Sequence, residues 1–462
     1  FIKKVILLWL FLLKRRNMAQ KVQKFGMVLP IVLLSYFMIL LDNSIIFTST
    51  VHISQDLQMS ATLLSWVSNA YALTFGGFLL FFGRMGDIYG RKRIFQIGLV
   101  IFTVASFLVG ISTSSTMIIV MRAFQGIGSA ILAPTTLAFL MDAYRGQQRA
   151  TAIAYYGVTA GLGASFGLLI GGLITSYSSW RYGFLINVPV GIIMFCLTQR
   201  FISQSLRDKD LVLDWWGAIL SVITFSSLVY SINGNVLRWL SGVICVFAFV
   251  TFLWIESHHS KPLMPLSLFR NGMRSSAYIA RFFFMSASMS YFFLMPQALQ
   301  RYFWYSPLQA AFAFIPMTLT QFIFSLFVNR LTQRFSNVFV LVLGTVMNLT
   351  GYIIGVGLGL HHGYFLGVAI PMVFIGVGQG LVLGPMTVEG VSDTKADEAG
   401  AASGVVNTVH QIGGAVGLSL VSLLTSSLSN PEKMIVHSQQ IMLIYVIIML
   451  LASLNIYRLK SK

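Results

Sequence analysis

Acidic residues are scarce in the long apolar stretches of this chain, so the few that lie there are the first candidates for chemistry. The 462 residues include only 13 Asp and Glu. Asp42 lies about sixteen residues into the first apolar stretch, and Glu389 closes a later one. A charged group in the hydrocarbon of a bilayer is costly and persists where it is paired, hydrated or functional. Asp42 is therefore the predicted proton carrier and Glu389 a second candidate, the alternatives being a permanently ion-paired Asp42 and a simple helix-end Glu389.

Basic residues also fall within apolar stretches, among them Arg122, Arg281 and His410. Arg122 needs a polar partner there, and the sequence leaves open whether that partner is Asp42 or only backbone carbonyls and the nearby Gln125. His410 lies beside Asn407 and Gln411. An imidazole can titrate near physiological pH, although a single helical His is more often simply hydrogen-bonded.

The elements that position these residues are membrane-spanning helices. Hydrophobic residues make up 56% of the chain and charged residues 10%, against roughly 25% charged in soluble domains. The apolar residues fall into blocks of about 20, which is the length that crosses a bilayer. The expected spans are 26–48, 60–82, 94–113, 115–140, 150–176, 183–204, 215–233, 237–255, 275–297, 305–329, 338–359, 363–390, 399–427 and 436–457. The chain is thus predicted to be an all-α polytopic membrane protein with fourteen transmembrane helices.

The basic residues predict the orientation of these helices. The formal net charge is +18, and 25 Lys and Arg fall in loops on the side of the N-terminus against 4 on the other side. Such a bias marks the cytoplasmic side, so both termini are predicted to be cytoplasmic. The positive charge then indicates contact with an anionic inner leaflet, and nucleic acid is not an expected partner. In this orientation Asp42 is expected toward the outer half of its helix.

A weak internal repeat divides the fourteen helices. Segments of the first half match segments of the second at near-constant shifts of 246 to 251 positions. The matched pairs are Arg84 with Arg330, Pro134 with Pro385, Gly163 with Gly413 and Gly167 with Gly417. Two six-helix bundles with two inserted linker helices are therefore predicted. The expected divisions are a leader at 1–25, the first bundle at 26–204, the linker with helices 7 and 8 at 205–260 and the second bundle at 261–462.

A charged loop and a glycine series are the other conspicuous patterns. The loop after the second span has an acid among bases at the cytoplasmic end of two helices, and is predicted to act as a conformational latch, the alternative being a plain positive anchor. Its predicted members are Gly83, Arg84, Asp87, Gly90 and Arg91. Gly163, Gly167 and Gly171 recur at every fourth position, which predicts close helix packing, a sealing surface between bundles, or both.

Several motifs resemble one known family. GRMGDIYGRKR at 83–93, MRAFQGIGSAILAP at 121–134 and WRYGFLINVPVG at 180–191 are similar to the fourteen-helix drug:proton antiporters of the major facilitator superfamily, and LDNSIIF at 41–47 resembles their acidic signature. The resemblance runs from about residue 26 to the C-terminus. It implies the major facilitator fold, a bacterial cell membrane location and a role for Arg122 in proton coupling. Leu168 stands where the family usually has proline, and His410 where relatives commonly have arginine.

The predicted function is proton-coupled export. The chain is rich in Phe, Tyr, Trp and Met, which accommodate lipophilic cations through cation–π contacts and adaptable packing. The residues expected to line the substrate cavity are Asp42, Asn43, Gln125, Phe284, Tyr291, Asn407 and Gln411. The scarcity of deep acids favours monovalent cations or zwitterions. The resemblance implies quaternary ammonium compounds, dyes and fluoroquinolone-like drugs as substrates.

Other functions are less well supported by the residues. The alternative within transport is a proton-coupled exporter of an endogenous lipid, siderophore or metabolite. An enzyme is not expected, because HExxH, GxSxG and GxxxxGK[ST] motifs are missing from the sequence. A passive channel is disfavoured by the two-bundle repeat. No cofactor and no metal are expected, only a proton gradient, and the protein is predicted to be a monomer.

Overall fold

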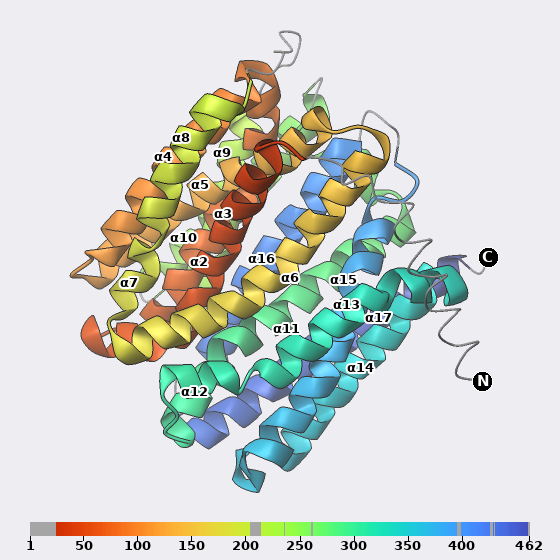
Figure 1. Cartoon of the computed structure of the whole chain (residues 1–462). Helices are drawn as coiled ribbons and strands as arrows, with labels where there is room; N and C mark the ends of the chain where they lie inside the picture. The colour runs from red at the N-terminus through yellow and green to blue at the C-terminus, as the bar shows by residue number, and fades with distance from the viewer. Residues whose placement is uncertain are drawn as a thin grey trace, which may run out of the picture.

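A computed structural model describes residues 25–203, 214–234, 236–259, 262–394, 399–425, 428 and 430–460. Within these residues the regular structure is entirely helical. Figure 1 shows two groups of long helices side by side, one coloured red to yellow and the other green to blue. The predicted leader at 1–25 lies almost wholly outside the described residues.

The first group contains the helices that precede residue 204. Its members are α2 (Val28–Asp56), α3 (Ala61–Tyr89), α4 (Arg91–Gly110), α5 (Ser115–Ala143), α6 (Gly146–Tyr177), α7 (Trp180–Leu185) and α8 (Asn187–Phe201). α3 and α4 both pack on α5, and α2 packs on α6. The short α7 and α8 together form one membrane crossing, Trp180–Phe201.

The second group and the inserted pair follow. The inserted helices are α9 (Trp215–Asn233) and α10 (Arg238–His258). The second group comprises α11 (Gly272–Tyr302), α12 (Pro307–Phe312), α13 (Ile315–Phe335), α14 (Asn337–Leu358), α15 (Ile370–Gly390), α16 (Ala399–Thr425) and α17 (Pro431–Lys460). A π-helical turn, η3 (Phe365–Ala369), leads into α15, and the 3₁₀ turns η1 (Leu266–Phe269) and η2 (Leu360–His362) precede α11 and η3.

By length and apolar composition, 13 segments of the described chain can cross a membrane. α6 is also long enough to cross one, because its 32 residues span about 48 Å at 1.5 Å per residue. The predicted all-α polytopic membrane architecture is therefore confirmed.

Polar side chains start the helices where the sequence turns between crossings. Ser60 accepts a hydrogen bond from the Leu63 amide, and Ser306 forms a reciprocal capping box with Gln309 at the start of α12. Between α3 and α4 the turn is made by Gly90 at φ 97°, a conformation that favours glycine. These local signals keep the connections short and the helices antiparallel.

Equivalent glycines occupy equivalent contacts in the two groups, as the sequence repeat predicts. A Cβ added at Gly126 would collide with Thr74 Oγ1, and one at Gly376 would collide with Thr320 Oγ1. Thr74 and Thr320 are 246 positions apart, which is also the shift between the two copies of the charged loop. Residues that match in the sequence repeat therefore also make matching helix–helix contacts.

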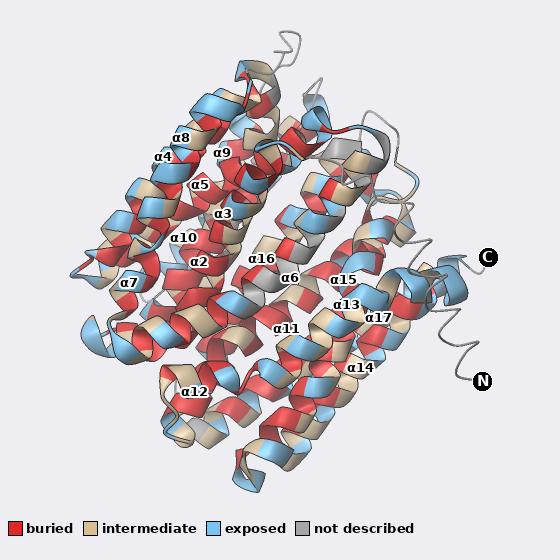
Figure 2. Cartoon of the chain, in the orientation of Figure 1, coloured by how far each residue is buried: buried red, intermediate tan, exposed pale blue. Residues whose placement is uncertain are grey.

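Burial follows the two-group arrangement. Figure 2 shows buried residues on the facing sides of the helices and exposed residues on their outer sides. α10 packs chiefly on α9, and its outer face exposes Trp239, Phe247 and Trp254. α9 packs on α3 and α16, so the inserted pair lies against the seam between the two groups. Large exposed apolar side chains are expected where a helix faces lipid.

Candidate functional site

A cavity of about 1430 Å³ lies between the two helix groups. Its wall is built from α2, α3, α5 and α6 on one side and α11, α13, α15 and α16 on the other. Arg84, Arg91 and Pro262, which lie at the cytoplasmic ends of the helices, also belong to its wall. The cavity therefore opens at the cytoplasmic side.

Contacts between the two groups close the opposite end. The Phe47 and Phe292 rings stack with centroids 5.7 Å apart. Gln300 donates to the Thr48 carbonyl at 3.2 Å, and the Leu308 amide donates to Ser176 Oγ at 2.9 Å. Aromatic packing and hydrogen bonds between α2, α6, α11 and α12 thus separate the cavity from the extracellular side.

Asp42 and Arg122 meet beside this cavity. Arg122 Nη1 lies 2.6 Å from Asp42 Oδ2, and both side chains are fully buried. Asp42 Oδ1 accepts from Gln125 Nε2 at 3.0 Å and from Asn187 Nδ2 at 2.8 Å. The carboxylate thus accepts hydrogen bonds from one charged and two neutral donors. A buried ion needs such a counter-ion and such hydrogen bonds to offset its loss of water. The open question of the partner of Arg122 is answered by this ion pair.

Arg122 has further contacts with its surroundings. Its Nε donates to the Val67 carbonyl at 3.1 Å and its Nη1 to Gln125 Oε1 at 2.9 Å, whereas Nη2 is buried with no hydrogen-bond partner. The guanidinium carbon lies 4.3 Å from the centroid of the Tyr71 ring. Because Tyr71 belongs to the cavity wall, one aromatic ring separates the ion pair from the cavity.

Two expectations about Asp42 need correction. Its helix runs from Val28 to Asp56, so Asp42 lies at the middle of this helix and not toward its outer half. The reason is that α2 extends eight residues beyond the predicted end at 48. Asp42 is also not on the cavity wall, because Arg122, Gln125 and Asn187 surround it.

The other predicted cavity residues divide in two. Asn43, Phe284, Asn407 and Gln411 line the cavity, as does His410. Gln125 and Tyr291 do not, which corrects the prediction for both. Gln125 is fully buried and donates to Asp42 and to Ser106. Tyr291 is fully buried in the second group, with its ring edge-on to Phe314 and Tyr352.

Glu389 lies apart from the Asp42 network and is not on the cavity wall. Its Oε1 accepts from Lys460 Nζ at 2.8 Å and from Asn337 Nδ2 at 2.9 Å. These partners belong to the end of α17 and the start of α14, both cytoplasmic. The structure therefore places Glu389 among residues that join helix ends, as the helix-end alternative described.

The predicted latch residues join several elements at the cytoplasmic side. Arg91 Nη1 lies 2.6 Å from Asp142 Oδ1, which links the start of α4 to the end of α5. Arg84 donates to the Pro262 carbonyl and interacts electrostatically with Glu256 and Asp214 of the inserted segment. Gly83 approaches Pro134, and Gly90 forms the turn. The Asp87 side chain lies outside the described part of the structure.

The glycine series of α6 packs against α2. A Cβ added at Gly163 would lie 2.7 Å from Leu40 Cβ, one at Gly167 2.5 Å from Ser44 Cβ, and one at Gly171 2.7 Å from Thr48 Oγ1. Each partner is one helical turn after the previous one. The neighbouring Gly172 instead approaches Pro307 and Ala311 of α12, across the groups.

Asn187 is a partner of Asp42 that the motif reading left unassigned. It belongs to WRYGFLINVPVG, which the sequence marks as unusual without showing what Asn187 contacts. At the other end of that motif, Trp180 Nε1 and Arg181 both donate to Asp56, and Arg181 Nη2 donates to the Ser112 carbonyl. The motif thus joins the extracellular ends of α2 and α4 and also supplies a ligand to Asp42.

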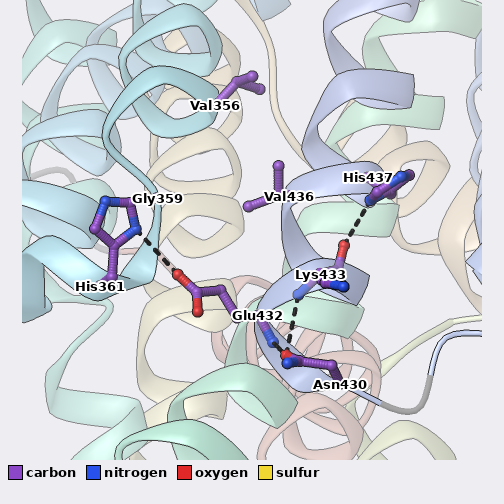
Figure 3. A pocket seen from close by; sticks show the side chains of 8 residues that line it. All are labelled: Val356, Gly359, His361, Asn430, Glu432, Lys433, Val436 and His437. Carbon is purple, nitrogen blue, oxygen red and sulfur yellow. Dashed lines mark hydrogen bonds and ion pairs between the residues drawn. The ribbon is translucent and has the colours of Figure 1, made fainter.

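A second, smaller hollow of about 350 Å³ lies at the extracellular side of the second group. Figure 3 shows its residues, with His361 Nδ1 3.0 Å from Glu432 Oε1 and the Lys433 carbonyl bonded to His437. His361 is 59% exposed, so this pair is a surface contact. It is not continuous with the central cavity, whose wall contains none of these residues.

Comparison with known sequences gives consistent matches over most of the chain. A sequence model described as Major Facilitator Superfamily matches residues 32–269 and 212–418. The cephamycin export protein CmcT of Amycolatopsis lactamdurans is 31% identical over 405 residues, covering 85% of this chain and 83% of CmcT. The uncharacterized MFS-type transporter EfpA of Mycobacterium tuberculosis strain H37Rv is 30% identical over 397 residues, covering 84% of this chain and 74% of EfpA.

A solved structure matches the fold. The crystal structure of a D-xylose-proton symporter superposes with a TM-score of 0.69, covering 93% of this chain and 96% of that chain. The two sequences are 13% identical, so this likeness concerns the fold alone.

Proposed function

Because the chain belongs to the major facilitator superfamily and is therefore a multi-pass transporter of the bacterial cell membrane, we propose that it exports lipophilic organic compounds in exchange for protons. The proposed substrates are cationic or zwitterionic compounds, including quaternary ammonium compounds, dyes and fluoroquinolone-like drugs. An exporter of cephamycin among its relatives supports the direction of transport.

One observation carries the proposal: a buried acid–base pair lies one ring behind a cytoplasm-facing cavity. Asp42 is fully buried at the middle of α2, and its neighbour Asn43 lies on the cavity wall. Tyr71 adjoins both the cavity and the ion pair, so a change in its packing changes the environment of Asp42. When Asp42 takes up a proton, its attraction for Arg122 falls, and α2 and α5 can separate.

The proposed cycle uses the proton gradient as its only energy source and needs no cofactor. Substrate enters from the cytoplasm or the inner leaflet, Asp42 releases its proton inward, and proton uptake from outside accompanies substrate release. One charge that crosses 100 mV supplies about 2.3 kcal/mol. Both bundles and the cavity come from one chain, which supports a monomeric transporter.

The test uses purified protein in proteoliposomes that hold a cationic dye. An imposed pH gradient should drive dye movement against its concentration, and an uncoupler should stop it. Dye movement that ignores both the gradient and the uncoupler would contradict the proposal and indicate a passive channel. A panel of endogenous lipids and siderophores in the same assay separates drug export from the alternative of an endogenous substrate.

A further inference from the structure

The wall of the central cavity has positive charge that no described carboxylate neutralises. Arg281 of α11 lines the cavity, and only 6% of the residue is exposed. Its Nη1 donates to the Leu383 carbonyl and to Thr387 Oγ1, both at 3.2 Å, while Nε is buried without a partner. The ion pairs of the described residues do not include Arg281.

Another buried arginine of the cavity region, Arg122, is neutralised by a carboxylate. Its counter-ion Asp42 lies at 2.6 Å. A guanidinium keeps its charge in proteins, and a buried charge without a counter-ion is strongly unfavourable. Arg281 has the burial of such a group but only neutral oxygens as partners, so an anion that enters the cavity would satisfy it.

The groups around Arg281 suit an aromatic anion. His410 of α16 and Tyr36 of α2 interact electrostatically with Arg281 and line the same cavity. Nδ1 of His410 is buried without a partner. Tyr36 stacks on Tyr156 of α6 with ring centroids 3.9 Å apart and planes 11° apart. Charge, a spare imidazole nitrogen and an aromatic surface therefore converge on one place.

These residues also lie at one depth. Arg281, His410, Tyr36 and Tyr156 are eight to eleven residues from the cytoplasmic starts of α11, α16, α2 and α6. At 1.5 Å per residue this corresponds to about 12 to 17 Å. The four side chains come from both bundles, so a ligand held by all of them would bridge the surfaces that move apart during transport.

We propose that Arg281 is an anion-binding residue of the central cavity and that the preferred substrate has a carboxylate or phosphate group beside an aromatic or lipophilic body. This inference rests on the proposed export function and narrows its substrate class. Zwitterions with a carboxylate fit the site, whereas purely cationic quaternary ammonium compounds leave Arg281 unpaired. Arg281, flanked by His410, receives the anion, and Tyr36 and Tyr156 contact the ring.

Two dyes test this preference because they differ in one group. Rhodamine 110 has a free carboxylate, and rhodamine 123 is its methyl ester and a cation. Fluorescence anisotropy with the detergent-purified protein measures their binding without any transport. We expect rhodamine 110 to bind at least about tenfold more tightly, and Arg281→Gln to remove that preference by weakening rhodamine 110 binding.

Control variants separate charge from structure. Arg281→Lys should keep much of the preference, and Arg330→Gln on the exposed counterpart of the charged loop should keep all of it. Equal binding of the two dyes by the unaltered protein, or equal loss of both in a monodisperse Arg281→Gln variant, would overturn the proposal. Competition by phosphatidylglycerol that depends on Arg281 would support the site and assign the anion to a lipid headgroup, whereas competition by 2-naphthoate would assign it to an organic acid.

The two proposals fail in different ways. Dye binding that depends on the carboxylate and on Arg281, without gradient-driven dye movement, would retain the anion site and reject proton-coupled export. Gradient-driven movement of both dyes at equal rates, with equal affinities, would retain export and reject the anion site.

Discussion

Arg122 Nη1 lies 2.6 Å from Asp42 Oδ2 although 80 positions separate the two residues, and neither side chain is exposed. Asn187 and Gln125 donate to the other carboxylate oxygen. A network this enclosed has two consequences: removing one charge leaves the other buried and unpaired, and the protonation of Asp42 changes every hydrogen bond around it.

Asp42→Asn should abolish coupling. The amide cannot exchange a proton, so drug-stimulated proton release from proteoliposomes should fall to background while the protein still elutes as a folded species. Stability should fall by about 3–5 kcal/mol because Arg122 loses its counter-ion.

The matched control is Asn43→Ala, the next residue, which lies on the cavity wall outside the ion pair. It should change drug affinity but keep proton release linked to drug movement. Coupling that persists unchanged in Asp42→Asn would remove the assigned role of Asp42.

The double variant Asp42→Asn with Arg122→Gln should recover stability but not coupling. Replacing both ions removes the unpaired buried charge. The free energy of unfolding of the double variant should therefore be at least about 2 kcal/mol higher than the sum of the two single-variant losses predicts. Thermal unfolding in detergent measures this coupling energy. Purely additive losses would show that the two charges do not stabilise each other.

Gly167→Ala should destabilise the first bundle. Its new Cβ would lie 2.5 Å from Ser44 Cβ and 3.1 Å from the Leu41 carbonyl, so α6 would have to move away from α2. Overpacking of this kind costs about 1–3 kcal/mol, which a melting curve detects.

Gly357→Ala is the control for helix propensity, because a Cβ there meets nothing within 4 Å. It should leave stability unchanged or slightly raised. Equal melting temperatures for the two variants would contradict the tight α2–α6 contact.

Arg91→Asp should impair transport more than stability. The Arg91–Asp142 pair is partly exposed, so its loss should cost less than about 1 kcal/mol of stability. If the pair holds the latch in the inward-open state, its loss should shift the distribution of distances between spin labels at the cytoplasmic ends and slow dye efflux.

The charge swap Arg91→Asp with Asp142→Arg should restore most of the efflux rate because it restores attraction between α4 and α5. A swap as slow as the single variant would indicate that Arg91 acts through another contact, such as the Ala138 carbonyl, and not through Asp142.

Local properties of the chain were enough to predict the membrane-spanning helices and their division into two bundles. Apolar length, the side on which Lys and Arg accumulate and the spacing of Gly163, Gly167 and Gly171 are all readable along the chain, and each reflects a contact with lipid or with an adjacent helix. The repeat could be recognised because equivalent residues form equivalent helix–helix contacts in the two halves.

Which side chains meet depended on the folded chain. Asn187 reaches Asp42 across 145 positions, and the rotation of each helix about its axis decides that Asn43 faces the cavity while Asp42 and Gln125 face the bundle interior. Arg281 and Glu389 were equally visible as charges in apolar stretches, yet one lines the cavity and the other bonds to Lys460. Helix rotation is set by all neighbouring helices together, and residue types along one helix do not contain that information.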